Sequence, residues 1–511
     1  MAKSTRFQEL PLGPRPADTP IHRWLYDELR RAILGGRLKT GARLPSTREL
    51  ARQQSVARTT VVAVFEQLLM EGYIASQVGS GTVVAGRLPD RFTAAPRAGT
   101  RPVAAPARAM PSAGTAAPQL SLPPPESGVR AFRLHEPGID CFPVQKWAQL
   151  AARRLRLSPA RLLGRGDARG YAPLREAVTS YLNTARGVHC DAAQVVIVSG
   201  TQQALDYVAR LTLRPGDPVW LEEPGYLGAR VVFRHSGARL VPVPVDQAGL
   251  DVAAALQREP DPKLVYITPA HQFPLGMALS LERRLALLAH AERRRCWIFE
   301  DDFDGEYRYD VRPIGALQGH DRCHSVIYAG SFNKMMFSSL RLGYVVLPPA
   351  LVEPFLALRS AVDRYPPTLE QAVLADFMQE GCFDRHIRKS RALYLERRDA
   401  LLAAGTRRLA GLLDLQPTNA GFHLLGALPA TIPDQEAQTA AAAQGVEVTP
   451  LSNFYLTKPA GNGLLLGFAP VGVGAIAHGV ERLARVLEKF PGARRPAHSA
   501  SPLKKARKNP I

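Results

Sequence analysis

The chain has 511 residues, of which 46% are hydrophobic, and a formal net charge of +20. That length exceeds one ordinary domain, so we expect a large core plus a smaller domain, and the charge indicates a polyanionic partner. The sequence has no run of about 20 apolar residues, no apolar signal core and no CxxC pair among its five cysteines, so we expect a cytoplasmic protein without a membrane partner, a disulfide framework or a metal site.

Residues 15–86 have the pattern of three helices and two short strands. Thr19 is expected to cap a first helix that has Pro20 in its first turn. Ser46-Thr47-Arg48-Glu49 is a capping box that opens a second helix, and a third helix is expected from about residue 58 to 71. The expected buried stripe of that helix is Val61, Phe65, Leu68 and Leu69. Two short strands with a glycine turn follow between residues 74 and 84. This pattern predicts a winged helix-turn-helix domain of the α+β class.

The start of the third helix is the expected DNA-reading element, because the N-terminal residues of a recognition helix approach base edges in the major groove. Arg58, Thr59 and Thr60 occupy that position. Arg43 and Arg48 flank it, and their guanidinium groups can meet phosphate or guanine. A helical bundle that binds protein is the alternative interpretation.

The stretch RLPSTRELARQQSVARTTVVAVFEQLLMEGYI resembles the GntR-type transcriptional regulators. The resemblance implies binding to a double-stranded DNA operator. The residues that it implies as DNA contacts are Arg43, Ser46, Arg48, Arg58, Thr59 and Gly81. One position departs from the family pattern, because Ala57 stands where a serine is usual. A hydroxyl that would cap the recognition helix or contact phosphate is therefore missing.

Residues 87–129 are rich in Pro, Ala, Gly, Ser and Arg and contain few large apolar side chains. Such a composition cannot form a packed core, so it predicts a semi-extended linker. At the C-terminus, residues 491–511 include the basic run Lys504-Lys505-Ala506-Arg507-Lys508 and are expected to form a disordered basic tail.

Residues 130–490 alternate strand-like apolar runs with helical patterns. The runs are VVIVSG (195–200), PVWLEEP (218–224), KLVYITP (263–269), CWIFEDD (296–302) and SVIYAGS (325–331). Helical patterns such as 202–213 and 281–295 lie between them. This alternation predicts an α/β domain with a largely parallel sheet. The pattern becomes more helical and mixed after about residue 348, which indicates a smaller α/β lobe over about 350–490.

The run Ser331-Phe332-Asn333-Lys334 ends a predicted strand, and Arg341 follows seven residues after the lysine. This spacing resembles the signature of the fold-type I aminotransferases, which depend on pyridoxal 5'-phosphate (PLP). The resemblance implies PLP bound as a Schiff base on Lys334, with Ser331 and Arg341 holding the phosphate. A solvated loop lysine is the alternative, and it leaves the serine and arginine spacing unexplained.

The run from Trp297 to Asp302 predicts a buried strand that ends in acids. Side chains alternate along a strand, so Asp301 and Phe303 share one face. In the family, an aspartate at the first position meets the pyridinium and a tyrosine at the second meets the ring hydroxyl. Asp301 matches this pattern, whereas Phe303 has no hydroxyl to donate. Asp302 is the alternative acid.

Three further segments are expected beside the cofactor. After a predicted strand, Gly200, Thr201 and Gln202 open a helix whose first-turn N–H groups can bind phosphate. Tyr226 matches the family's stacking aromatic, with a buried core tyrosine as the alternative. The run from 268 to 276 resembles the family's loop beside the ring, and it places His271 there.

Two differences from active aminotransferases bear on function. Where related enzymes carry an arginine for the substrate carboxylate, this chain reads Gly463-Leu464-Leu465-Leu466-Gly467-Phe468. Arg165 stands where the family usually has a tyrosine that reaches across the dimer. We therefore assign no catalytic residue.

The combination of a GntR-type winged helix, a Pro-rich linker and a fold-type I aminotransferase domain resembles the MocR subfamily of regulators. The resemblance implies a nucleoid-associated homodimer with a cross-subunit domain arrangement, in which PLP or a PLP-amine adduct is the sensed ligand. Two alternatives stay open. One is a bifunctional regulator with residual aminotransferase activity, and the other is a regulator whose aminotransferase-like domain no longer binds PLP.

Overall fold

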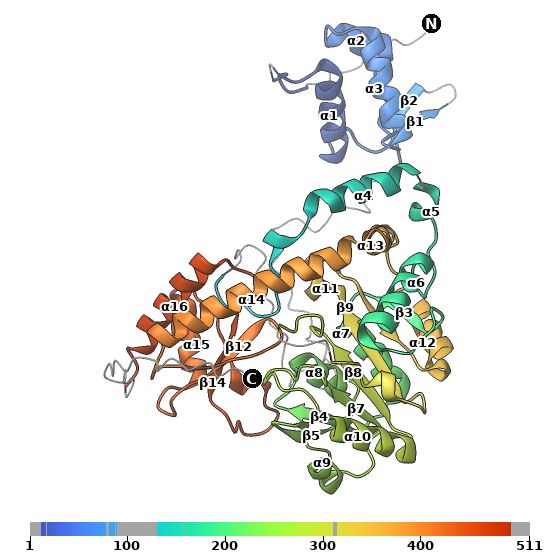
Figure 1. The fold of residues 1–511 in the computed structure, drawn as a ribbon. Helices are drawn as coiled ribbons and strands as arrows, with labels where there is room; N and C mark the ends of the chain where they lie inside the picture. The colour runs from blue at the N-terminus through green and yellow to red at the C-terminus, as the bar shows by residue number, and fades with distance from the viewer. Residues whose placement is uncertain are drawn as a thin grey trace, which may run out of the picture. The chain divides into compact units, whose positions relative to one another are not determined.

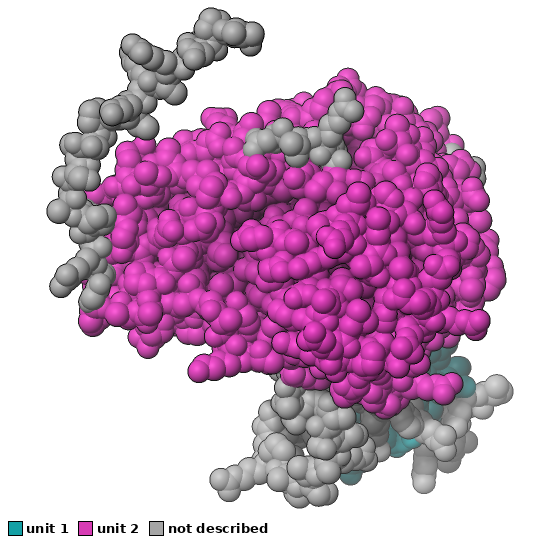
Figure 2. Space-filling view, turned by 60° about the horizontal axis from the view of Figure 1, so that its bottom comes forward, with its two compact units in different colours: residues 1–110 teal, residues 111–511 magenta. Residues whose placement is uncertain are grey.

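The computed structural model of the protein describes residues 12–16, 18–77, 81–86, 88, 130–157, 159–309 and 314–491. The chain divides into two compact units, residues 1–110 and 111–511, which have different colours in Figure 2. Apart from residue 88, the predicted linker 87–129 lies outside the described residues, and so does the predicted tail beyond residue 491.

The first unit contains three helices and an antiparallel strand pair. Its elements are α1 (Ile21–Leu34), α2 (Thr47–Gln53), α3 (Arg58–Met70), β1 (Ile74–Gln77) and β2 (Gly81–Val84). The strand register runs from Ile74 opposite Val84 to Gln77 opposite Gly81. This arrangement confirms the predicted winged helix-turn-helix fold, although the turn residues 78–80 lie outside the described residues.

Two local predictions in this unit are wrong. Pro20 occupies the N-cap of α1 and no side chain makes a capping bond there, so Thr19 is not the cap. On α3, Val61, Phe65 and Leu68 are buried as expected, but Leu69 is 45% exposed and Val64 is buried in its place. The predicted capping of α2 is confirmed, because the backbone N–H of Glu49 donates to Ser46 Oγ at 3.2 Å.

The second unit contains two sheets and the remaining helices (Figure 1). Its helices are α4 (Val144–Leu157), α5 (Pro159–Leu163), α6 (Ala172–Tyr181), α7 (Thr201–Thr212), α8 (Leu227–His235), α9 (Val252–Arg258), α10 (Leu281–Arg294), α11 (Phe332–Met335), α12 (Pro349–Val362), α13 (Leu369–Gln379), α14 (Cys382–Arg408), α15 (Asp434–Ala443) and α16 (Val473–Leu487). Short helical turns are η4 (Ile139–Cys141), η5 (Leu182–Arg186), η6 (Gln318–His320), η7 (Ser338–Leu340) and η8 (Leu451–Phe454). Its strands are β3 (Val195–Val198), β4 (Pro218–Glu223), β5 (Arg239–Asp246), β6 (Gly249–Leu250), β7 (Leu264–Ile267), β8 (Trp297–Asp302), β9 (Val326–Ser331), β10 (Gly343–Val346), β11 (Asp414–Gln416), β12 (His423–Ala427), β13 (Thr449–Pro450) and β14 (Gly463–Gly467).

The larger sheet has eight strands in the order β3-β10-β9-β8-β7-β4-β5-β6. Strand β10 runs antiparallel to both of its neighbours and β6 runs antiparallel to β5, whereas the central strands are parallel. The α/β class and the largely parallel sheet are therefore confirmed. The parallel strands β7, β8 and β9 end at one edge of this sheet, where open α/β folds place their ligands.

Helices cover both faces of the larger sheet, which explains why its strands are apolar on both sides. One face packs against α7, α8 and α12 and includes Tyr266 and Phe299. The other face packs against α9 and α10 and includes Val265 and Ile298. Because side chains alternate along β8, Asp301 belongs to the α7 face and its neighbour Asp302 to the opposite face.

The smaller sheet has the order β11-β12-β14-β13, with all pairs antiparallel, and packs with α14, α15 and α16. Helix α12, which begins at residue 349, belongs to the larger lobe, because its Phe355 packs on the larger sheet and the helix contacts α7. With 27 residues, α14 is the longest of the described helices, and none of them is both long and apolar enough to cross a membrane.

Candidate functional site

Lys334 lies on the short helix α11, directly after β9. Its Nζ donates a hydrogen bond to the main-chain carbonyl of His135 at 2.5 Å. Burial lowers the pKa of Lys334 to about 8. A larger fraction of this amine is therefore neutral at physiological pH than in an ordinary lysine, and the neutral amine is the form that attacks a carbonyl.

Asp301 ends the α7 face of β8 and is 4% exposed. Tyr266, on the neighbouring strand β7, donates to Asp301 Oδ2 at 2.8 Å, and Thr201 at the start of α7 donates to Oδ1 at 3.4 Å. Burial raises the pKa of Asp301 to about 7, although both hydrogen bonds act in the opposite direction. A cationic ring nitrogen placed beside Asp301 would favour its ionised form.

Asp302 points to the opposite face of β8, where it belongs to a different network. Its Oδ2 accepts hydrogen bonds from Arg186 Nε at 2.9 Å and from the Tyr328 hydroxyl at 2.6 Å. Arg186 and Asp302 are both almost completely buried. Asp302 is thus held by structural partners, and of the two acids Asp301 is the one that lies with Thr201 and Tyr266.

Tyr226 stands at the N-cap of α8 and lies on the same side of the sheet as Asp301. Its ring is 6.3 Å from the ring of Tyr266, and the two are stacked at 26°. The Tyr226 hydroxyl donates to Gln202 Oε1 at 3.3 Å. The structure therefore brings together Tyr226, Gln202, Thr201 and Asp301.

The loop before α7 approaches the segment after Lys334. Gly200 has φ +146° and ψ 175°, a conformation essentially restricted to glycine. A Cβ on Gly200 would lie 3.1 Å from Asn333 Nδ2 and 3.9 Å from an Arg341 guanidinium nitrogen. Arg341 is exposed in the single chain, and Ser331 is buried at the end of β9. Of the predicted phosphate-binding residues, Arg341 therefore lies close to the Gly200 turn.

Phe303 and His271 lie beside each other, with ring centroids 6.0 Å apart. His271 Nδ1 is 2.8 Å from Asp304 Oδ2, and both side chains are almost fully buried. A Cβ at Gly421 would approach the His271 ring to 2.2 Å, so His271 lies against the β11–β12 connection of the smaller lobe. Its ring is 6.0 Å from that of His423 on β12, whose pKa burial lowers to about 4.

The expected DNA-contacting residues lie at three places in the first unit. Arg58 and Thr59 are exposed on the first turn of α3, and Thr60 is half-buried. Arg48 is exposed on the first turn of α2. Ser46 uses its hydroxyl oxygen to cap α2, as described above.

Arg43 and Gly81 are brought together at the wing. Arg43 forms an isolated antiparallel bridge with Val83. Gly81 has φ +82°, and a Cβ there would lie 3.3 Å from the guanidinium of Arg43. Helix α3 begins after Ala57, which occupies its N-cap without any side-chain hydrogen bond. The departure at Ala57 therefore leaves the recognition helix without a side-chain cap.

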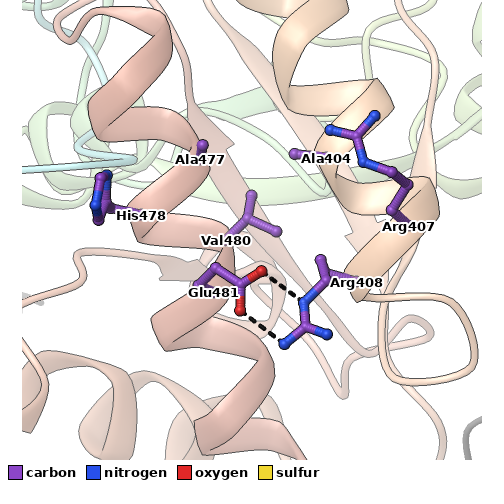
Figure 3. A pocket seen from close by; sticks show the side chains of 7 residues that line it. All are labelled: Ala404, Arg407, Arg408, Ala477, His478, Val480 and Glu481. Atoms are coloured by element: carbon purple, nitrogen blue, oxygen red, sulfur yellow. Dashed lines mark hydrogen bonds and ion pairs between the residues drawn. The ribbon is translucent and has the colours of Figure 1, made fainter.

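Two cavities occur away from these residues. One of about 230 Å³ lies between α14 and α16, where Arg408 Nε is 2.6 Å from Glu481 Oε1 (Figure 3). Its lining residues are Ala404, Arg407, Arg408, Ala477, His478, Val480 and Glu481. The other, of about 160 Å³, is lined by Tyr181, Ala185, Arg186, Glu306, Asp384, Ile387, Arg388 and Arg391. None of the residues expected to hold PLP lines either cavity.

Sequence reasoning missed Tyr266, Asp304 and His135. Tyr266 could have been found, because it lies in a predicted strand and its side chain is on the same face of the larger sheet as Asp301, the face that packs against α7. Asp304 follows Phe303 in a run of acids of which only Asp301 and Asp302 were considered as partners of the ring. His135 carried no signal, because its bond to Lys334 joins residues 199 positions apart.

Comparison with known proteins identifies both units. Residues 22–84 match the family "Bacterial regulatory proteins, gntR family", and residues 137–463 match "Aminotransferase class I and II". The chain is 40% identical over 472 residues to the probable rhizopine catabolism regulatory protein MocR of Rhizobium meliloti, covering 92% of this chain and 94% of that protein. It is 29% identical to the HTH-type pyridoxine biosynthesis transcriptional regulator PdxR of Corynebacterium glutamicum, covering 90% of this chain and 94% of that protein.

Among solved structures, the second unit is similar to LysN, the α-aminoadipate aminotransferase of Thermus thermophilus, in complex with N-(5'-phosphopyridoxyl)-L-leucine. The TM-score is 0.66 at 30% identity, over 71% of this chain and 92% of that chain. The fold and the site thus define a helix-turn-helix transcriptional regulator whose second unit has the fold of the PLP-dependent aminotransferases. The chain belongs to the MocR subfamily of GntR-type regulators.

Proposed function

We propose that the protein is a PLP-responsive regulator that binds an operator as a homodimer and senses PLP, or a PLP-amine adduct, without turning over a substrate. The observation that carries the proposal is that Asp301 and Tyr226 lie together at the edge of the larger sheet, where Asp301 interacts electrostatically with Lys334. The PdxR relative, whose name refers to pyridoxine biosynthesis, is consistent with a ligand of this class.

The residues present fit PLP. When bound, PLP supplies an aldehyde that accepts an amine and a ring that acts as an electron sink. Lys334 would hold the aldehyde carbon as a Schiff base. Asp301, whose hydrogen-bond partners are two neutral hydroxyls, would keep the ring nitrogen protonated. Tyr226 would cover the ring face.

The phosphate would meet the N–H groups of Gly200, Thr201 and Gln202, together with Ser331 and Arg341. Gly200 fits this role because it leaves open the space that a Cβ would fill near Arg341. Backbone N–H groups at a helix start, combined with one planar guanidinium, form a strong dianion site.

Sensing without turnover is favoured by the apolar wall beside this site. Leu465, from the run where related enzymes carry an arginine, is fully buried and packs in one cluster with Phe273 and Phe454. Tyr226 and Phe303 lie against the same cluster. Such a wall offers no charge to a substrate carboxylate. The second candidate, residual transamination, is favoured by the lowered pKa of Lys334.

The homodimer is supported by apolar side chains that one chain leaves in water. Leu155 at the end of α4 is 41% exposed, and Leu157 and Leu163 are each 73% exposed. Exposed apolar groups close together in sequence are typical of a surface that a partner covers. Arg165 follows this region and would reach the partner's ligand in the cross-subunit arrangement.

The proposal is tested with the purified full chain. Added PLP should give the visible absorption of a Schiff base in the wild type and in Lys389→Ala, but not in Lys334→Ala. PLP should change operator affinity in the wild type and in Lys389→Ala, but not in Lys334→Ala. Lys389 is a matched control because it is exposed on α14. A colourless wild type, or an operator affinity indifferent to PLP, would refute PLP sensing, and steady turnover of an amino acid with a keto acid would favour the second candidate.

A further inference from the structure

The first described segment of the second unit lies against the candidate Schiff-base lysine. Besides the bond from Lys334 Nζ to the His135 carbonyl, the carboxylate of Glu136 stabilises the charged form of Lys334. The ring of His135 packs on Phe273, with centroids 5.0 Å apart. The C-terminal half of this segment is therefore tied to the larger lobe.

The N-terminal half of the same segment is tied to the smaller lobe. The N–H of Gly467 on β14 donates to the Phe132 carbonyl at 2.9 Å, and the N–H of Glu447 donates to the Ala131 carbonyl at 3.1 Å. Arg133 forms an ion pair with the Glu447 side chain. Residues 131–136 thus bridge the two lobes, with Lys334 at one end and the smaller sheet at the other.

The backbone of this bridge is strained at two positions. Phe132 has φ +70° and His135 has φ +65°, and neither residue is glycine. Bulky side chains rarely adopt this left-handed conformation, which persists only where surrounding contacts impose it. The bridge is therefore poised to rearrange when one of its attachments is lost.

We propose that residues 131–136 form a strap that reports the chemical state of Lys334, closed on the larger lobe when the amine is free and released when the amine is in a Schiff base. The inference rests on the proposed function only in taking PLP as the aldehyde. In the condensation, the amine nitrogen forms a C=N bond to the aldehyde carbon, and the carbonyl oxygen leaves as water with two protons from the nitrogen. A neutral imine nitrogen has no N–H left to donate to His135.

The strap is close in sequence to the predicted linker. Residue 130 is the first described residue after the predicted linker, so the strap is the part of the second unit nearest in sequence to that linker. The hydrogen bonds of the strap to Glu447 and Gly467 remain when the hydrogen bond from Lys334 to His135 is lost. A released strap therefore moves with the smaller lobe, so the strap has two distinct positions, which is the two-state requirement for allostery.

The test is amide hydrogen exchange of the full chain, read for peptides within 131–137, in two Lys334 variants with and without PLP. Lys334→Met removes the donor, so exchange should rise about tenfold without PLP, the effect of losing one charge-assisted hydrogen bond. Lys334→Arg keeps a donor but forms no Schiff base, so its exchange should stay slow and unchanged by PLP. Wild type should exchange slowly alone and at the Lys334→Met rate with PLP.

Lys389→Met, which changes an exposed lysine of α14, should behave as the wild type. Faster exchange in β12 or a lower unfolding temperature would show that the fold of Lys334→Met is damaged. In that case the effect of PLP on exchange in the wild type and in Lys334→Arg tests the strap. The strap is overturned if folded Lys334→Met exchanges as slowly as the wild type, or if PLP colours the wild type without changing exchange in 131–137. A wild type that takes up no PLP refutes the proposed function instead, and Lys334→Met alone still tests the strap.

Discussion

Arg186 and Asp302 form an ion pair in which the side chains are 1% and 2% exposed. Asp302 follows Asp301 on β8 and points to the opposite face of the sheet. Tyr328 adds a third hydrogen bond to the same carboxylate oxygen of Asp302. The contribution of the ion pair is to fix the end of β8, because removing one partner would leave a charge without compensation in a nonpolar environment.

Arg186→Met should therefore destabilise the second unit by about 3–5 kcal/mol. The matched control is Arg239→Met, which removes a guanidinium that is 54% exposed from its pair with Glu259 and should cost about 1 kcal/mol or less. Urea unfolding followed by circular dichroism measures both. Equal midpoints for the two variants would show that the buried pair does not hold this region.

Asp301 makes the stability of the ligand-free protein depend on pH. Its folded pKa of about 7 lies above the ordinary value of 3.8, so the folded state binds this proton more tightly than the unfolded chain does. The contribution of Asp301 to stability is present at low pH and is lost as the pH rises from about 4 to about 7. The side chain introduced by Asp301→Asn does not titrate. The free energy of unfolding of this variant, relative to that of the wild type, should therefore rise across that window by up to about 4 kcal/mol.

The measurement is the free energy of unfolding of both proteins without PLP between pH 4.5 and 8. Asp246→Asn is the control, because Arg283 holds the pKa of Asp246 below its ordinary value. Its difference from the wild type should be constant above pH 5. A constant difference for Asp301→Asn as well would mean that Asp301 is ionised throughout, contrary to its buried position.

Gly200→Ala should weaken PLP binding at least about tenfold, because strain of this size accompanies a non-glycine residue in this backbone conformation. The added Cβ would also press on Asn333. Gly472→Ala is the control, since its φ is −72° and a Cβ there meets nothing within 4 Å. Titration with PLP, followed by its visible absorption, gives both affinities. An unchanged dissociation constant for Gly200→Ala would place the phosphate elsewhere.

Ala57→Ser should restore a side-chain cap to α3 and stabilise it by about 1 kcal/mol. Slower hydrogen exchange in the first turns of α3 and tighter operator binding are the expected results. Ala57→Val adds bulk without a hydroxyl and should give neither. If serine and valine behave alike, the N-cap does not limit the recognition helix.

Patterns local in sequence predicted most of the fold. The run CWIFEDD predicted β8 within one residue and put Asp301 on the ligand face, because alternation is fixed by strand geometry. Leu69 was misassigned because it lies at the flank of the apolar stripe of α3, and Val64 fills the core instead. The antiparallel direction of β10 was not predictable, since the direction of a strand leaves no mark on its periodicity.

The candidate site was predictable where residues are close in sequence, as with Lys334 and Arg341. The partners that set its electrostatics were not. Tyr266 is 35 residues from Asp301, and Arg186 is 116 residues from Asp302. Such contacts depend on how strands and helices assemble, and no spacing rule encodes them.

The first unit has a core of its own, which includes Trp24, Leu29, Phe65 and Leu88 and is separate from the clusters of the second unit. A gene encoding this protein should therefore yield two kinds of mutant. Substitutions that damage the first core should abolish operator binding. Substitutions around Lys334 should leave a protein that binds the operator but does not respond to the ligand. In cells carrying both alleles, the second kind should be dominant, because an unresponsive protein still competes for the same DNA.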